Sequence, residues 1–274
     1  MARAAELGLE GEALLSDAPG RVVDLTRSAV AAGAELVVVV GGDGTVNEAV
    51  NGLLPDGAEC ELAVVPCGTG DDFARTFGIP TKTEEALAVA AGGQARQVDV
   101  GRARFGSDES ERYFANFAGA GISGGIAQRG EVTSRRLGAR AAYFWATIAV
   151  FARWKNVPMT IEADGQKREG RMLEVIAANG AYAAGGMRIA PDASPDDGQF
   201  DVVLIGDVSK LDFMTTFPKI YRGKHVGHPK VDVLKARSVS VTAETPLPVV
   251  LDGEQPGTTP VRFEILPRAL KLRA

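Results

Sequence analysis

Residues 36–48 read Leu36-Val37-Val38-Val39-Val40-Gly41-Gly42-Asp43-Gly44-Thr45-Val46-Asn47-Glu48. The first five are apolar and mostly β-branched, which is typical of a strand buried on both faces of a parallel sheet. Three glycines follow within four positions, and apolar residues then recur at helical spacing as far as Leu53. This order of strand, glycine loop and helix predicts a backbone that approaches a phosphate closely and points unpaired N–H groups at it.

The most informative residue of this loop is Asp43. A carboxylate inside an anion-binding loop repels a phosphate unless a cation lies between them, so Asp43 indicates a metal-dependent nucleotide site. Gly-Asp-Gly is also ordinary turn chemistry, which leaves a purely structural interpretation open. The glycine spacing matches neither the dinucleotide-binding fingerprint nor the P-loop.

A second unit of the same kind follows. Leu62-Ala63-Val64-Val65 predicts another buried strand, which leads into Gly68-Thr69-Gly70-Asp71-Asp72-Phe73-Ala74-Arg75. Two such loops in neighbouring strand–helix units can flank one polyphosphate. Asp71 and Asp72 also stand where helix N-caps are expected, so capping is the alternative role for them.

Both loops resemble the nucleotide-binding signature of the diacylglycerol kinase catalytic domain. That superfamily includes bacterial lipid kinases and sphingosine kinases and, more distantly, NAD kinases. The second loop differs from the family pattern only where Asp71 replaces an asparagine, which adds negative charge near the phosphates. Other markers of the family recur as Phe114-Ala115-Asn116, Asn179-Gly180, Gly185-Gly186-Met187-Arg188-Ile189-Ala190-Pro191, Asp196-Asp197-Gly198 and Asp252-Gly253-Glu254. The resemblance therefore covers nearly the whole chain from residue 13 onward.

The resemblance implies an ATP site with a catalytic metal. The family's aspartates at the positions of Asp43, Asp72 and Asp99 form one metal–water network, and Glu254 occupies the position proposed as the general base. Ser16 falls where the family has a threonine beside the nucleotide. The implied nucleotide contacts are Gly41, Gly42, Asp43, Gly44, Thr45, Val46, Asn47, Glu48, Gly68, Thr69, Gly70 and Ser16.

The start of the chain lacks a pattern for the first strand and phosphate loop that this architecture requires. Residues 1–35 predict a short helix, a strand at Ala13-Leu14-Leu15, and a helix from about Gly20 to Ala32. The resembling family opens with a strand and a phosphate-facing loop, which nothing here matches, so the parallel sheet is expected to lack its first strand. Two explanations stay open: a coding start upstream of Met1, or a natural short form with weakened nucleotide binding.

From about residue 101 short apolar segments alternate with turns, which predicts a β-sandwich or barrel-like second domain. Helical patterns interrupt it at Ser134–Trp154 and Lys210–Tyr221. The expected organisation is an α/β nucleotide domain at 1–98, a β-sandwich substrate domain at 99–265, and a segment at 266–274 that returns to the first domain. A predicted strand at Arg96–Gly101 closes the first domain. The predicted strands that follow it are Tyr113–Ala118, Met159–Ala163, Leu173–Asn179, Asp201–Ile205, Val231–Val233, Ser238–Ala243, Pro248–Leu251 and Val261–Leu266.

Two turns of this second domain have alternative roles. Asp196-Asp197-Gly198 is a turn by its composition. The resemblance adds a structural magnesium ion held by the Asp197 side chain and by the carbonyl oxygens of Ser194 and Gln199. Asp252-Gly253 is a hairpin turn in its own right.

Composition limits the classes of partner. A net charge of −5 argues against nucleic acid, and two cysteines are too few for a disulfide framework and indicate a reducing compartment. The longest apolar run, Ala141 to Ala152, is too short to span a bilayer, so it predicts a core helix or one that touches a membrane surface.

These features predict an ATP- and Mg²⁺-dependent lipid kinase that phosphorylates a lipid alcohol such as diacylglycerol. We expect a cytoplasmic enzyme that contacts the inner face of the membrane transiently, with a homodimer as an open possibility. The alternatives are a kinase of a soluble acceptor, similar to NAD kinase, and a nucleotide-binding regulator with impaired catalysis.

Overall fold

The computed structural model describes residues 2–54, 59–106, 110–127 and 147–274. Within these residues the strands form an eight-stranded and a six-stranded sheet. The larger sheet contains β1 (Leu36–Gly41), β2 (Glu61–Pro66), β3 (Ala95–Phe105), β4 (Ser110–Phe114), β6 (Val157–Ala163), β7 (Gln166–Met172), β11 (Ser238–Ala243) and β14 (Val261–Arg273). The smaller sheet contains β5 (Phe117–Gly121), β8 (Glu174–Ala178), β9 (Phe200–Ile205), β10 (Val231–Ala236), β12 (Pro248–Leu251) and β13 (Glu254–Thr258).

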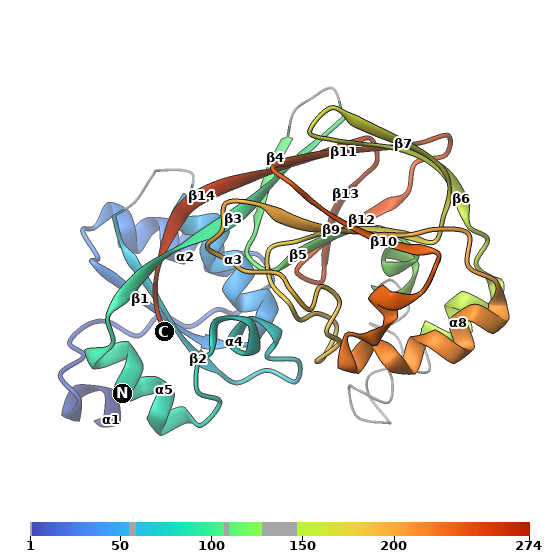
Figure 1. Cartoon of the computed structure of the whole chain (residues 1–274). Helices are drawn as coiled ribbons and strands as arrows, with labels where there is room; N and C mark the ends of the chain where they lie inside the picture. The colour runs from blue at the N-terminus through green and yellow to red at the C-terminus, as the bar shows by residue number, and fades with distance from the viewer. Residues whose placement is uncertain (1, 55–58, 107–109, 128–146) are drawn as a thin grey trace.

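The N-terminal part contains the two predicted strand–loop–helix units. β1 and β2 pair in parallel, and each leads through a glycine loop into a helix, α3 (Asp43–Leu53) and α4 (Asp72–Phe77). α2 (Arg21–Ala31) packs on α3, and α5 (Thr83–Gly92) packs on β2 (Figure 1). Because the strands are parallel, both glycine loops lie at the same edge of the sheet.

Near the start of the chain one prediction is wrong. α1 (Ala2–Glu6) and α2 agree with the two predicted helices, but residues 13–15 form no strand, and Leu15 is 89% exposed. An apolar triplet becomes a strand only when a neighbour completes its hydrogen bonds. In the described part of the chain β1 is the end strand of its sheet and pairs with β2 alone.

The predicted strand Tyr113–Ala118 is also wrong in part, because the chain changes sheet inside it. β4 belongs to the larger sheet and β5 to the smaller one. Where the chain passes from β4 to β5, the backbone N–H groups of Ala115, Asn116 and Phe117, the first residue of β5, bind the carboxylate of Asp252. A distant side chain therefore ends one strand and starts the next.

The other predicted strands correspond to observed ones, and two observed strands had no prediction. β7 is exposed along nearly its whole length and carries charged residues on both faces, so it lacks an apolar pattern. β13 contains Pro256 and Gly257, which are unfavourable inside strands. The confirmed strands are β1, β2, β3, β6, β8, β9, β10, β11, β12 and the first part of β14.

β3 and β14 run side by side through both parts of the larger sheet (Figure 1). They pair in antiparallel fashion from Val261↔Phe105 to Arg273↔Ala95, with a register shift between Leu266 and Leu270. The end of β14 then pairs in parallel with β2. β14 is thus much longer than the predicted segment, while the division of the chain at residues 98 and 265 stays a prediction.

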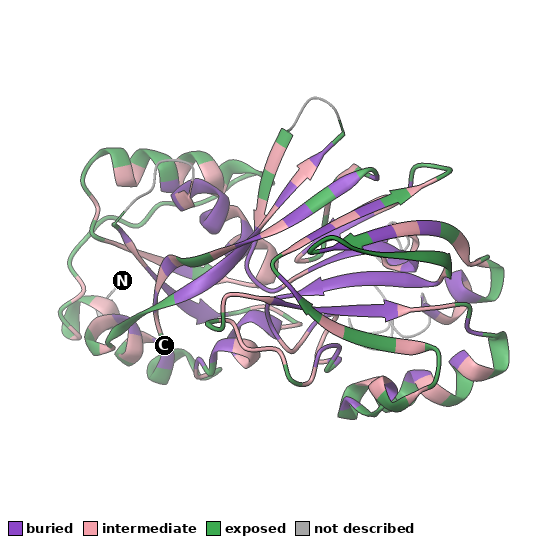
Figure 2. Ribbon diagram, turned by 45° about the horizontal axis from the view of Figure 1, so that its top comes forward, coloured by how far each residue is buried: buried purple, intermediate pink, exposed green. Residues whose placement is uncertain are grey.

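The two sheets enclose a common core in the C-terminal part, which confirms the predicted sandwich. Phe114 of the larger sheet stacks on Phe200 of the smaller one at a ring-centroid distance of 5.6 Å, and Phe263 meets it edge-on at 5.9 Å. Figure 2 shows buried residues along the facing strands of both sheets. This packing holds the two sheets in a fixed relation around the site.

Short helices cover one end of the sandwich. The predicted helix Lys210–Tyr221 is observed as α8 (Lys210–Thr216) and the 3₁₀ helix η2 (Phe217–Arg222), and a second 3₁₀ helix, η3 (Lys224–Gly227), follows. Of the predicted helix Ser134–Trp154, residues 147–153 are helical, and residues 134–146 lie outside the described residues. Among the described helices none is long and apolar enough to cross a bilayer.

Candidate active site

The two glycine loops touch each other at the edge of the sheet. A Cβ added to Gly68 would lie 2.7 Å from the Cα of Gly42, so neither position has room for a side chain. A Cβ on Gly41 would lie equally close to the Thr45 side chain, which folds back over the loop. The structure therefore brings the predicted phosphate loops together, with backbone exposed between them.

Asp43 faces the second loop. Its Oδ1 accepts a hydrogen bond from the Phe73 N–H at 2.9 Å, and its Oδ2 would lie 2.7 Å from a Cβ on Gly70. Asp72 lies nearby: burial, and to a smaller extent the Asp43 carboxylate, raise the pKa of Asp72 above its ordinary value. Two carboxylates thus share one end of the site, which is an arrangement that a cation would stabilise.

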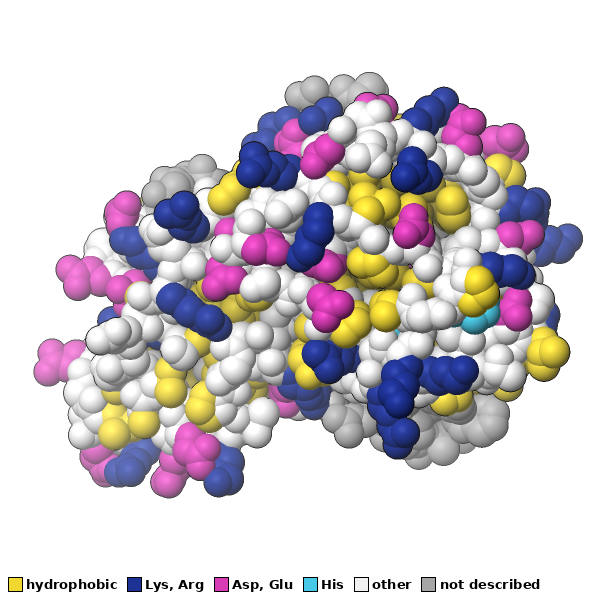
Figure 3. Space-filling view, in the orientation of Figure 1, with side chains coloured by type: hydrophobic (Ala, Val, Ile, Leu, Met, Phe, Trp, Pro, Cys, Tyr) yellow, Lys and Arg dark blue, Asp and Glu magenta, His cyan; other side chains and the backbone are white. Residues whose placement is uncertain are grey.

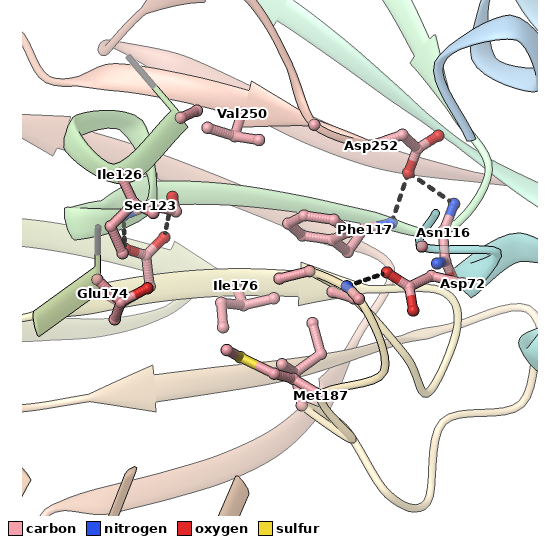
Figure 4. Close-up of a pocket in the computed structure, with 18 of the residues that line it drawn as sticks. Asp72, Asn116, Phe117, Ser123, Ile126, Glu174, Ile176, Met187, Val250 and Asp252 are labelled. Atoms are coloured by element: carbon pink, nitrogen blue, oxygen red, sulfur yellow. Dashed lines mark hydrogen bonds between the residues drawn. The ribbon is translucent and has the colours of Figure 1, made fainter. Parts of the chain in front are cut away.

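Asp72 also connects this end of the site to the C-terminal part of the chain. Its two carboxylate oxygens accept hydrogen bonds from the N–H groups of Gly185 and Gly186, each at 2.7 Å, and Arg75 lies 3.1 Å away. Figure 4 shows Asp72 at one side of the pocket, with a dashed line for a hydrogen bond to its carboxylate. The alternative role predicted for Asp72 is to cap the start of α4. The structure shows that it also binds the Gly185–Gly186 backbone.

The Asp252-Gly253-Glu254 turn reaches the same place from the other sheet. A Cβ on Gly44 would lie 3.4 Å from the Oε1 atom of Glu254, so the predicted base stands beside the first glycine loop. Asp252 is held by four donors, the three N–H groups between β4 and β5 and the side-chain amide of Asn47 at 3.0 Å. Burial raises the pKa of Asp252, while these donors oppose the rise. The turn that carries Glu254 is thus fixed by its neighbour.

Two predicted nucleotide contacts hold the protein's own backbone. The side-chain amide of Asn47 donates to Asp252 and to the Tyr113 carbonyl oxygen. The carboxylate of Glu48 accepts from the N–H groups of Gly20 at 2.9 Å and Val22 at 3.0 Å, which are unpaired donors at the start of α2. Direct contact of either side chain with a nucleotide stays a prediction.

Replacing Glu48 with alanine is therefore expected to lower the free energy of unfolding by about 1 kcal/mol, the usual cost of a lost helix cap. The dissociation constant for ATP should change less than about threefold, which is under 0.7 kcal/mol. Thermal unfolding and calorimetric titration measure the two quantities. The exposed Glu12→Ala variant serves as the control, and a tenfold loss of ATP affinity in Glu48→Ala alone would return Glu48 to the nucleotide site.

Asp99 is fully buried, and the structure does not bring it to the cleft with Asp43 and Asp72. Its carboxylate accepts from the N–H of Gly198 at 2.6 Å and from the N–H of Arg268 at 2.8 Å. Arg268 lies in the register shift of β14 and has a left-handed backbone conformation. Asp99 thus fastens this irregularity to the Gly198 turn, and its part in a metal–water network stays a prediction.

The second predicted metal ligand, Asp197, also has protein partners. One carboxylate oxygen accepts from the Gln199 N–H at 3.0 Å, and the other binds the Lys235 ammonium at 2.8 Å. The carbonyl oxygen of Ser194, the predicted ligand atom, accepts from the Asp197 N–H at 3.5 Å, and the Ser194 hydroxyl donates to Asp196 at 2.6 Å. Among the described residues no group of three or more His, Cys, Asp or Glu side chains is placed to hold a metal ion. Metal binding by Asp197, Ser194 and Gln199 stays a prediction.

The remaining predicted contacts divide into two groups. Val46, Thr69 and Gly70 line the pocket beside Asp43. Ser16 is exposed, and its hydroxyl donates to the Ala18 carbonyl oxygen, so no observed contact ties it to the loops.

A cavity of about 570 Å³ extends from these polar groups into the C-terminal part of the chain. Figure 4 shows Asp72, Asn116 and Asp252 at one side of this cavity, followed by apolar side chains. The apolar wall includes Phe117, Ile122, Ile126, Ile176, Met187, Ile189, Phe213, Phe217 and Ile220. Its size and lining are those of a site for an apolar small molecule with one polar end.

Glu174 lies at the far side of this cavity and was not predicted to matter. It is 3% exposed, and its carboxylate accepts from the hydroxyl of Ser123 at 2.7 Å and from the Ser123 N–H at 2.8 Å. Burial raises the pKa of Glu174 to about 7, against the effect of those two donors. The only sequence signal was a single carboxylate within the apolar run Leu173–Ala178.

This carboxyl group should make stability depend on pH. Between about pH 4.5 and 7 folded Glu174 keeps its proton while the unfolded chain has lost it, so the free energy of unfolding falls as pH rises. The free energy of unfolding of the Glu174→Gln variant lacks this dependence on pH. Between pH 5 and pH 8 it should therefore rise by about 2 kcal/mol relative to that of wild type. Urea unfolding at both pH values measures the difference. Glu162→Gln, at an exposed strand position, should show none; equal behaviour of the two variants would contradict the assignment.

Comparisons with known proteins agree with this architecture. Residues 2–103 match the family described as the diacylglycerol kinase catalytic domain, and residues 117–274 match the YegS C-terminal NAD kinase beta sandwich-like domain. The diacylglycerol kinase of Staphylococcus carnosus is 30% identical over 93% of this chain and 82% of its own length. That of Staphylococcus aureus strain JH9 is 31% identical over 88% of this chain and 74% of its own.

A solved structure has the same fold throughout. It is that of a candidate diacylglycerol kinase from Bacillus anthracis, 28% identical, with a TM-score of 0.81 over 99% of this chain and 88% of that protein. The matched regions cover both glycine loops and the turn that carries Glu254. By sequence and by fold, this chain belongs to the diacylglycerol kinase family.

Proposed function

We propose that this protein transfers the γ-phosphoryl group of ATP to the hydroxyl group of a lipid alcohol, with Mg²⁺ as the metal. One observation carries the proposal: the Glu254 carboxylate stands beside Gly44 of the first glycine loop, at one end of a largely apolar cavity. A phosphate-binding backbone, a carboxylate and an apolar pocket are the three parts that such a reaction needs. The names of the relatives support the same substrate class.

The residues around Asp43 fit a magnesium ion. Mg²⁺ is usually held by one or two carboxylates together with substrate phosphates and water. The Oδ2 atom of Asp43 accepts no hydrogen bond within the described residues, and it faces Gly70 beside Asp72. When bound, Mg²⁺ would neutralise charge on the phosphates, and the glycine loops would hold them through backbone N–H groups.

In the transfer step Glu254 would act as the general base. The acceptor hydroxyl oxygen forms a bond to the γ-phosphorus, while the bond from that phosphorus to the bridging oxygen breaks and its electron pair leaves with ADP. The hydroxyl proton passes to Glu254. Asp252 keeps the turn in place through its four hydrogen bonds, and the apolar wall excludes water that would otherwise compete as acceptor.

The apolar lining favours a lipid over a soluble acceptor. NAD or a similar polar molecule would leave its own polar groups unpaired against Phe117, Ile176 and Met187. A regulator without catalysis would have no use for a carboxylate beside the phosphate loop. We further infer that the protein works in the cytoplasm at the inner face of the membrane, where its substrate lies.

Turnover of radiolabelled ATP against a panel of acceptors tests the proposal. The panel holds diacylglycerol, monoacylglycerol, ceramide and a sphingoid base in detergent micelles, with NAD as the soluble acceptor. Mg²⁺-dependent label in at least one lipid, and none in NAD, is the expected result. Label in NAD alone would make the protein a soluble-acceptor kinase, and ATP binding without any transfer would make it a regulator.

A further inference from the structure

The segment formed by α8 and η2 has two different faces. Its inner face contributes Phe213, Phe217 and Ile220 to the wall of the acceptor cavity. There Phe213 stacks between Phe151 and Phe217, with centroid distances of 3.6 and 4.9 Å. The inner face is therefore firmly packed, and the orientation of the outer face is fixed by it.

The outer face exposes large apolar side chains. Leu211 is 74% exposed and Met214 is 52% exposed, and they stand three residues apart, on the same side of α8. Single exposed apolar residues are common on protein surfaces. Leu211 and Met214, however, form a pair, and their helix also lines the cavity for the apolar ligand. Such a pair indicates a surface that binds an apolar partner.

The same segment is basic, although the protein is acidic. Residues 210–230 contain five Lys or Arg residues and one acidic residue, Asp212, whereas the whole chain has a net charge of −5. Lys219, Arg222 and Lys224 are exposed, and within the described residues they form no ion pair. Figure 3 shows Lys and Arg side chains gathered over this region of the surface.

We propose that this docking surface, defined as Leu211, Met214, Lys219, Arg222 and Lys224, binds the face of an anionic lipid bilayer. Basic residues are attracted to anionic headgroups, and exposed apolar side chains enter the layer just below them. This inference rests on the proposed lipid kinase function, because docking here brings the wall of the acceptor cavity to the place where the acceptor resides. A second copy of the chain fits less well, since a symmetric contact would set one basic surface against another.

Vesicle sedimentation with the full chain tests the surface directly. The vesicles are phosphatidylcholine alone, or an equimolar mixture of phosphatidylcholine and phosphatidylglycerol. Wild type should bind the mixed vesicles at least tenfold more tightly than the neutral ones. The triple variant Lys219→Glu, Arg222→Glu, Lys224→Glu should lose at least about a hundredfold of that binding, and Leu211→Ser with Met214→Ser about tenfold.

A matched control separates this surface from net charge. Arg27, Lys82 and Arg168 are exposed and lie outside α8, η2 and η3, and their replacement by Glu changes the net charge by the same amount. That control should retain wild-type binding to within about threefold; an equal loss in the control would overturn the proposal, as would full binding by the surface variants. Thermal melting confirms that each variant is folded.

Turnover of diacylglycerol in detergent micelles measures the kinase activity without a bilayer, so it separates a failure of the docking surface from a failure of the proposed function. The surface variants should retain wild-type turnover in micelles within about twofold and lose it on mixed vesicles. Micellar turnover without vesicle binding by wild type overturns the docking surface alone. Absence of micellar turnover with every lipid of the panel overturns the kinase function instead. A dimer that dissociates in the Leu211→Ser, Met214→Ser variant would assign the surface to a second copy and overturn bilayer docking.

Discussion

Replacement of Asp43 by asparagine is expected to lower kcat for phosphoryl transfer by at least about a thousandfold, or about 4 kcal/mol of barrier. Asparagine keeps an oxygen that can accept from the Phe73 N–H, so the loop should stay in place. In the proposed site the substitution removes the negative charge beside the phosphates, and with it the attraction for a cation. Steady-state turnover at saturating ATP and Mg²⁺ measures the loss.

The neighbouring loop offers a matched control for this substitution. Asp71→Asn removes the same charge at a residue in the left-handed conformation, which asparagine also adopts readily. It restores the family's residue and should change kcat less than about fivefold, or 1 kcal/mol. The melting temperature of Asp43→Asn should not fall, because the variant relieves the repulsion at Asp72. A kcat above a tenth of wild type would show that Asp43 does not support the metal.

Replacement of Glu254 by glutamine is expected to lower kcat by about a hundredfold or more, near 2.7 kcal/mol, with ATP affinity unchanged. In the proposed mechanism Glu254, which lies beside Gly44, takes the proton of the acceptor hydroxyl, whereas the backbone of the loops holds the nucleotide. Glutamine has the same shape and cannot take the proton. Turnover and calorimetric titration with a non-hydrolysable ATP analogue therefore separate chemistry from binding.

Glu244→Gln is the control for this variant, because Glu244 is an exposed residue outside the cavity. It should behave as wild type in both measurements. A parallel loss of ATP affinity in Glu254→Gln would move Glu254 into the nucleotide site. A normal kcat would remove it from the chemistry altogether.

The parts of the site that the sequence predicts are those with local signals. The β1–α3 and β2–α4 units are predicted by β-branched runs, glycine spacing and helical periodicity, all within a few residues. The failed strand at residues 13–15 shows the limit of this logic. Its apolar triplet is a local signal too, but a strand also needs a neighbour, and no sequence pattern states whether one is near.

Other features depend on contacts between residues far apart in the chain. Glu48 is predicted only as a nucleotide contact, and the structure shows that it also caps α2. Asp252 is predicted only as part of a hairpin turn, and it also binds the backbone where the chain passes from β4 to β5. Glu174 sits in an apolar run, and only the packed structure shows that its carboxylate is enclosed beside Ser123. A glutamate has the same place in the sequence whether its strand faces solvent or the interior. The sequence alone therefore could not show that the Glu174 carboxylate is buried.

The pairing of the long strand β14 affects how the protein folds during its synthesis. β2 finds one of its partners only about 200 residues further along the chain, at Lys271–Arg273. Such distant pairing gives the fold a high contact order and slows its folding. On the ribosome, the glycine loops would emerge early, yet the sheet that supports them could close only after Lys271–Arg273 had left the exit tunnel. Until then β2 would carry an open strand edge, and exposed edges of this kind favour aggregation and binding by chaperones.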